Sequence, residues 1–148
     1  MKILKIHSLE KGWRDKNEVL LHACFQLLVD YVEKEKGLSG HIDWNWDEAH
    51  RQTAKEMRSL YRWWTKTRPN RKDPVLELPR KYWPADEEWF VDATDQEGRE
   101  CRMMADLSKR YPEYYAAMRR SWKLEDKWFD EDQRNLHRLI EIRRHLWT

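Results

Sequence analysis

Apolar residues recur at helical spacing along three long stretches of the chain. The longest stretch predicts a helix over residues 112–145, because its apolar row repeats every three or four residues and no glycine or proline follows Pro112. The row consists of Tyr115, Met118, Trp122, Glu125, Phe129, Asp132, Leu136, Leu139, Arg143 and Leu146. A helix of this length, roughly 50 Å, cannot cover its own apolar side, so we expect other segments to pack along it.

Two further stretches predict helices in the first half of the chain. Residues 15–36 carry two adjacent apolar rows, and Gly37 follows them as a helix-ending glycine. Residues 46–67 carry one row, and this helix should end before Pro69. The row consists of Trp46, His50, Thr53, Met57, Leu60 and Trp64. The apolar arc of the first of these helices is the wider one, so we expect it to be the most buried helix.

Prolines interrupt the helical pattern between residues 68 and 98. They recur every five residues, which excludes a helix and disfavours a central strand; they are Pro69, Pro74, Pro79 and Pro84. Irregular segments of this length are usually functional or wrap around a core, and Trp83 and Trp89 could anchor such a wrap. Beyond Gly98, residues 99–110 predict a short helix with Met103 and Met104 facing inward.

The composition supports a folded helical protein. The chain contains four glycines, ten tryptophans and 38% charged residues; disordered chains are equally charged but poor in aromatics. The sequence therefore predicts an all-α fold in a single helical domain, residues 1–148. This fold is a helical bundle of three long helices plus one short helix, with a proline-rich irregular wrapping segment at about 68–98. The longest helix should extend beyond its partners and expose Trp and Met, so we expect a homodimer.

The charge balance and the two cysteines indicate the expected partners and the cellular compartment of the protein. A net charge of +2, with both signs interspersed, gives no general attraction to nucleic acid or to an anionic membrane, so neither is an expected partner. No apolar run is long enough for a signal sequence or a membrane span. Cys24 and Cys101 lack metal-binding spacing and suit a reducing compartment. We expect a cytoplasmic protein.

Polar residues that fall on or beside the apolar rows form the first set of candidate site residues. The set consists of His22, Gln26, His50, Glu125 and Asp132. Inside a helical bundle, His22, His50, Glu125 and Asp132 could hold a metal ion for a metal-dependent enzyme. Such sites usually repeat a Glu-x-x-His signature, which is missing here. We therefore favour a structural role, in which each buried polar group pairs with a Trp, Tyr or Arg side chain, and we expect no metal, no cofactor and no catalytic residue.

A second set of candidates mixes cations with aromatic rings. Cations interleaved with aromatic faces can hold a nucleotide or a partner surface. The candidates are Arg62, Trp63, Lys66, Arg68, Arg71, Trp83 and Trp89. In the alternative interpretation, which we favour, Trp64 belongs to the core, Trp63 packs under the proline-rich segment, and the cations form a solvated helix end.

Four stretches of the chain resemble small proteins encoded widely by tailed bacteriophages. They are HACFQLLVDYVEKEK, HIDWNWDEAH, LYRWWTKTRPNRKDP and RLIEIRRHLWT. The resemblance covers both helical ends of the chain and implies a viral origin with expression in the cytoplasm of the bacterial host. That family carries no established activity, so the resemblance transfers no catalytic or ligand-binding residue.

These observations favour a phage accessory protein that binds a host bacterial protein, either against a defence system or in host takeover, without catalysis. The chain has no glycine-rich phosphate loop and no HExxH or CxxC motif, and its arginines and aromatics suit an interface. Three alternatives stay open: sequestration of a nucleotide-like small molecule, the metal-dependent enzyme described above, and a virion or assembly component.

Overall fold

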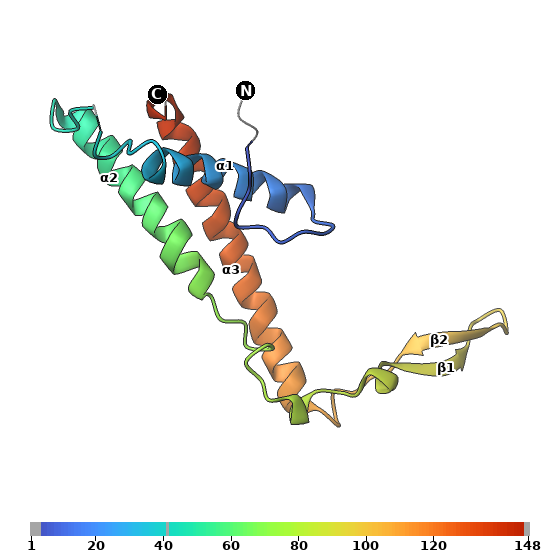
Figure 1. The fold of residues 1–148 in the computed structure, drawn as a ribbon. Coiled ribbons are helices and arrows are strands. Elements are labelled where there is room, and N and C mark those ends of the chain that lie inside the picture. The colour runs from blue at the N-terminus through green and yellow to red at the C-terminus, as the bar shows by residue number, and fades with distance from the viewer. Residues whose placement is uncertain (1–3, 41, 147–148) are drawn as a thin grey trace. The chain divides into compact units, whose positions relative to one another are not determined.

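The computed structural model describes residues 4–40 and 42–146 (Figure 1). Its main elements are the helices α1 (Lys16–Glu33), α2 (Glu48–Arg62) and α3 (Pro112–Ile142) and the strands β1 (Phe90–Thr94) and β2 (Glu100–Met104). Contacts divide the chain into two compact units. Unit 1 holds the described residues up to Arg71 and from Trp128 onward, and unit 2 is Lys72–Lys127. Among the described residues, no helix is long and apolar enough to cross a membrane.

The core of unit 1 lies where α1 crosses α2 and the last turns of α3 (Figure 1). Phe25 and Leu28 of α1 are fully buried there. The helix ends at Glu33, and the ring of Tyr31 then packs flat on Gly37. A Cβ at position 37 would come within 2.1 Å of that ring, so the glycine is required by this close approach.

α2 begins at a side-chain cap and ends in a wider helical turn. Asp47 Oδ1 accepts the backbone N–H of His50 at 2.8 Å, as an N-cap aspartate does. After Arg62 the chain continues as a π-helical turn, Trp63–Thr67, which buries both Trp63 and Trp64. Such a turn holds one more residue than a regular α-helical turn, and here both consecutive indoles are buried.

The buried tryptophan near the start of α2 is not the expected one. Trp46 was expected in the buried row but is exposed. Trp44 is buried instead, because its indole N–H donates to the Gly37 carbonyl at 2.8 Å. A tryptophan outside the helix therefore closes this end of the core.

The buried row of α3 also differs from the expected one. Its buried residues are Tyr114, Ala117, Ser121, Asn135, Leu139 and Ile142. Trp122 and Phe129, which were expected to be buried, are more than half exposed, and Glu125 is exposed as well. Ala117 and Ser121 are small, so neighbouring segments can approach the helix closely on that side. Trp122 and Phe129 lie on the adjacent side of the helix and face solvent.

The predicted all-α fold class is wrong, because the chain is mostly helical but includes a two-stranded antiparallel sheet. Residues 99–110, expected to form a short helix, supply β2, and β1 comes from the segment expected to be irregular. Asp95 Oδ1 accepts the backbone N–H groups of Glu97 and Arg99, and Gly98 adopts a positive φ of 79°. These interactions form the tight turn that pairs the strands.

Candidate functional site

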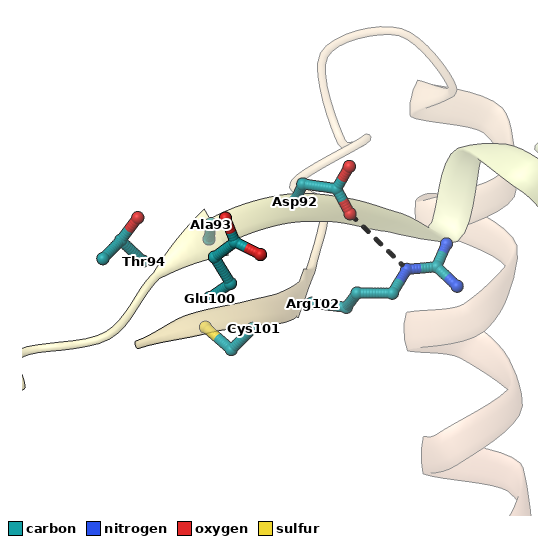
Figure 2. Close-up of a pocket in the computed structure, with 6 residues that line it drawn as sticks. All are labelled: Asp92, Ala93, Thr94, Glu100, Cys101 and Arg102. Carbon is teal, nitrogen blue, oxygen red and sulfur yellow. Dashed lines mark ion pairs between the residues drawn. The ribbon is translucent and has the colours of Figure 1, made fainter. Parts of the chain in front are cut away.

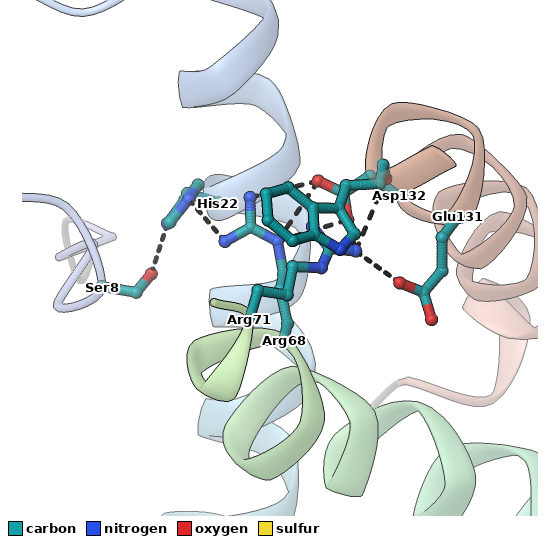
Figure 3. Close-up of polar contacts among 7 residues, drawn as sticks. Ser8, His22, Arg68, Arg71, Glu131 and Asp132 are labelled. Atoms are coloured by element: carbon teal, nitrogen blue, oxygen red, sulfur yellow. Dashed lines mark hydrogen bonds and ion pairs between the residues drawn. The ribbon is translucent and has the colours of Figure 1, made fainter. Parts of the chain in front are cut away.

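A cluster of charged side chains joins the end of α2 to α3 in unit 1 (Figure 3). Asp132 on α3 accepts hydrogen bonds from two arginines. Arg68 Nη2 lies 3.1 Å from Asp132 Oδ2, and Arg71 Nη2 lies 2.6 Å from Asp132 Oδ1. Arg71 Nη2 also donates to Glu131 Oε2 at 2.6 Å. Two positive and two negative groups therefore neutralise one another in a largely buried place.

His22 completes this cluster from α1 (Figure 3). Its Nε2 lies 3.4 Å from Arg68 Nη1, and its Nδ1 lies 2.8 Å from Ser8 Oγ. Because a guanidinium group only donates, Nε2 must be the acceptor, so Nδ1 carries the proton and donates to Ser8. Burial, with a further contribution from the Arg68 charge, lowers the pKa of His22. The neutral imidazole thus holds the Arg68 side chain in place.

Aromatic rings cover both arginines of the cluster. Trp64 stacks on Phe25 with ring centroids 4.5 Å apart, and the Arg68 guanidinium carbon lies 4.8 Å from the Trp64 centroid. The Arg71 guanidinium carbon lies between Trp63 and Trp128, 5.7 and 5.6 Å from their centroids. Trp63 is buried, so its ring is not available to a ligand. Arginine and tryptophan here stabilise the protein itself, in agreement with the favoured structural interpretation, although Arg68 and Arg71 are paired with carboxylates and are not solvated as expected.

The remaining basic and aromatic candidates do not extend this cluster. Arg62 and Lys66 are exposed at the end of α2. Trp83 and Trp89 belong to unit 2, where both indoles pack on Tyr114 at 5.2 and 5.6 Å between centroids. They therefore anchor the segment between Arg71 and β1, which is the role that the sequence indicates for them.

The residues that were considered as metal ligands do not lie together in the structure. His50 pairs with Asp47 at 2.8 Å, while His22 and Asp132 meet only through Arg68. The expectation that Glu125 is buried is wrong; its side chain is exposed because the small-residue row of α3 faces inward instead. Across residues 4–40 and 42–146, no three or more His, Cys, Asp or Glu residues are placed to hold a metal ion.

Gln26, the remaining buried polar candidate, has a structural role. Its amide oxygen accepts the backbone N–H of His7 at 2.9 Å, and its amide nitrogen donates to Asp30 at 2.7 Å. Together with the hydrogen bond between Ser8 and His22, these contacts tie the N-terminal segment to α1. The buried amide is thereby satisfied, but by a backbone N–H and a carboxylate and not by the expected Trp, Tyr or Arg side chain.

An apolar cleft of about 200 Å³ opens beside the charged cluster, between α1 and α3. Leu20 of α1 and Phe129 of α3 flank it and are both more than half exposed. Arg68 and Asp132, already paired with each other, form part of its wall. The sequence pattern placed Leu20 in the core. The wide apolar arc of α1 predicts burial, but the neighbouring segments cover only part of it, so Leu20 stays exposed.

A larger hollow of about 530 Å³ lies against the hairpin of unit 2 (Figure 2). Its lining comes only from the two strands: Asp92, Ala93, Thr94, Glu100, Cys101 and Arg102. These side chains are exposed or half-exposed, and Arg102 Nε lies 3.9 Å from Asp92 Oδ1 at the surface. With no buried polar group and walls from one ribbon only, the hollow is a poor binding site for a small ligand.

No protein-family model, curated protein or solved structure matches the chain. The site is therefore interpreted from its own geometry. The polar atoms of the charged cluster are engaged with one another, whereas the apolar side chains of the cleft are open to solvent. This arrangement is suited to binding an apolar group.

Proposed function

We propose that this protein acts by binding a partner protein through the unit 1 cleft, without a chemical step. The observation that carries the proposal is the exposure of Leu20 and Phe129 on either side of the cleft, next to Arg68 and Asp132, which are already paired with each other. Exposed apolar side chains with polar surroundings are typical of protein–protein contact sites. The resemblance to tailed-phage proteins suggests that the partner is a host bacterial protein.

The size of the cleft favours a protein side chain over a small molecule. Small-molecule sites usually enclose about 300–1,000 Å³. The cleft, at about 200 Å³, has room for one large side chain. Interfaces are commonly dominated by a few such anchors that insert into a pocket of the partner. We therefore expect the host protein to present a leucine-sized or aromatic side chain to this cleft.

The charges beside the cleft argue against a nucleotide as the main ligand. A phosphate group would have to displace Asp132 from Arg68 and Arg71, or Glu131 from Arg71. Replacing one anion by another at a paired site recovers little free energy, because the carboxylate then loses its own partners. An apolar anchor leaves these ion pairs intact.

A capture experiment with two matched leucine variants tests the proposal. Leu20 and Leu27 both lie on α1 with 57% and 52% of their surface exposed, but only Leu20 lines the cleft. Tagged wild-type protein, Leu20→Asp and Leu27→Asp are incubated with bacterial lysate, and bound proteins are quantified by mass spectrometry. We expect one host protein, at near-stoichiometric yield, with wild type and Leu27→Asp but not with Leu20→Asp.

The captured protein is then purified and titrated calorimetrically with each variant. Circular dichroism verifies that both variants fold like the wild type. If Leu20→Asp bound the captured protein as tightly as the wild type does, the cleft would not be part of the interface. Background capture by all three proteins would overturn the binding function itself.

A further inference from the structure

The hairpin of unit 2 separates its apolar and charged residues onto opposite faces. Residues that pair directly across antiparallel strands share a face, and neighbours along each strand alternate. The register pairs Val91 with Met103 and Ala93 with Cys101, so one face carries only these four apolar residues. The other pairs place every charged residue of the two strands on the opposite face; they are Phe90–Met104, Asp92–Arg102 and Thr94–Glu100.

The charged face carries one solvent-exposed ion pair and one cation–aromatic contact, whereas the apolar face has no polar group to solvate it. On the charged face, Asp92 pairs with Arg102 at 3.9 Å, and the Arg102 guanidinium carbon lies 5.5 Å from the Phe90 ring centroid. On the apolar face, Val91 and Met103 are about half exposed. A two-stranded hairpin is marginally stable by itself and gains stability when its apolar face is covered. Within unit 2, as the structure describes it, no segment covers this apolar face.

Edge-to-edge pairing with a second copy would not provide this cover. Symmetric pairing of two β1 strands about their centre puts Asp92 opposite Asp92, and symmetric pairing of two β2 strands puts Arg102 opposite Arg102. Like charges directly opposite each other destabilise a sheet. Pairing β1 of one copy with β2 of the next is not closed and would continue into a filament. The apolar face would stay exposed in all three arrangements.

Face-to-face packing of two hairpins avoids these costs and fits the sizes of the side chains. On the apolar face, the larger pair Val91 and Met103 lies next to the smaller pair Ala93 and Cys101. A two-fold axis between the faces, perpendicular to the strands, places the larger pair of each copy over the smaller pair of the other. Sheets that pack in this way lie about 10 Å apart and interdigitate their side chains. No charged side chain becomes buried, because all of them lie on the outer faces.

We propose that the apolar face of the hairpin joins two copies of this chain into a symmetric dimer. The proposal uses only residues of unit 2 and is independent of the partner-binding cleft in unit 1. It also differs from the dimer expected from the sequence, which depended on exposed residues of the longest helix. The hairpin contact is small, so we expect a reversible dimer whose population depends on protein concentration.

Two adjacent methionines provide a matched test of the dimer. Met103 and Met104 are neighbours in β2, with 54% and 71% of their surface exposed, but they lie on opposite faces. Sedimentation velocity over a concentration series compares wild type with Met103→Asp and Met104→Asp. We expect wild type and Met104→Asp to dimerise with similar affinity. Met103→Asp should bind itself at least about tenfold more weakly, because a carboxylate would enter the apolar contact.

Chemical cross-linking gives a second readout that does not depend on hydrodynamics. With Cys24 replaced by serine, Cys101 is the remaining thiol of the chain and lies on the apolar face. A short bis-maleimide should then yield a covalent dimer, which Met103→Asp should abolish and Met104→Asp should retain. Circular dichroism and tryptophan fluorescence verify that both variants fold.

Three outcomes would overturn the proposal. Wild type that stays monomeric over the whole concentration series would show that no second copy covers the face, even if another protein does. Equal weakening by Met103→Asp and Met104→Asp would place the contact elsewhere, as would a dimer that Met103→Asp leaves unchanged. Leu20→Asp should dimerise like the wild type, so failure of the partner-binding proposal is distinguishable from failure of this one.

Discussion

The charged cluster of unit 1 and the hairpin of unit 2 use the same residue types in opposite ways. In unit 1, arginines lie against the faces of tryptophan rings and pair with a carboxylate, and apolar Leu20 and Phe129 are exposed beside them. In the hairpin, every charged residue lies on one face, the other face carries only apolar residues, and neither face is buried. A polar residue is thus buried where a partner charge neutralises it, and an apolar residue is exposed where no described segment of its own unit packs on it.

The largest expected effect comes from removing the aromatic layer of unit 1. Trp64 is buried, stacks on Phe25 and lies under Arg68. We expect Trp64→Ala to lower the free energy of unfolding by about 3–5 kcal/mol, because it leaves a cavity and removes the ring that covers the arginine. Urea unfolding followed by circular dichroism measures this loss. An unchanged midpoint would mean that Trp64 contributes no more than an exposed residue.

A smaller effect is expected from removing the shared carboxylate. Asp132→Ala leaves Arg68 and Arg71 without their common acceptor, so we expect the free energy of unfolding to fall by about 2–3 kcal/mol. Asp130 is exposed on the same helix, and Asp130→Ala should change stability by less than about 0.5 kcal/mol. Thermal unfolding of both variants provides the comparison. Equal melting temperatures would show that the cluster does not depend on Asp132.

The smallest effect is a pH dependence that originates in His22. Burial and Arg68 lower the pKa of His22 below its ordinary value of 6.5, so the unfolded chain binds a proton more readily than the folded one. The stability contributed by His22 is complete above about pH 6.5 and is lost as the pH falls toward the lowered folded pKa. His22→Gln should therefore flatten the stability profile in this range.

His145 also has a lowered pKa, but it is present in both proteins, so the difference between their profiles isolates His22. Urea unfolding at a series of pH values from 7.5 downward gives the two profiles. Parallel profiles would contradict the assigned role of His22 as a neutral acceptor for Arg68.

The sequence predicts the parts of the fold that depend on local signals. Pro112 was identified correctly as the start of α3, because a helix start depends on the few residues around it. The core position of Trp64 was also predicted, from its place in an apolar row. Each of these conclusions requires only one element at a time.

The parts that the sequence does not predict depend on which segments meet. The run of Cys101, Met103 and Met104 suits a helix as well as a strand, and only pairing with β1 decides between them. The buried row of α3 is set by the neighbours that approach Ala117, not by the aromatic residues beside it. The cleft was missed for the same reason, since an apolar row on α1 does not show where its cover ends.

The most direct test of the account measures partner capture and self-association side by side in wild type, Leu20→Asp and Met103→Asp. The account assigns these two properties to different units, so it predicts that each variant loses one and retains the other. Leu20→Asp should dimerise normally but fail to capture the host protein, and Met103→Asp should capture it at low concentration while remaining monomeric. If one substitution abolished both properties in a folded protein, or if neither affected either property, the division between the two units would be contradicted.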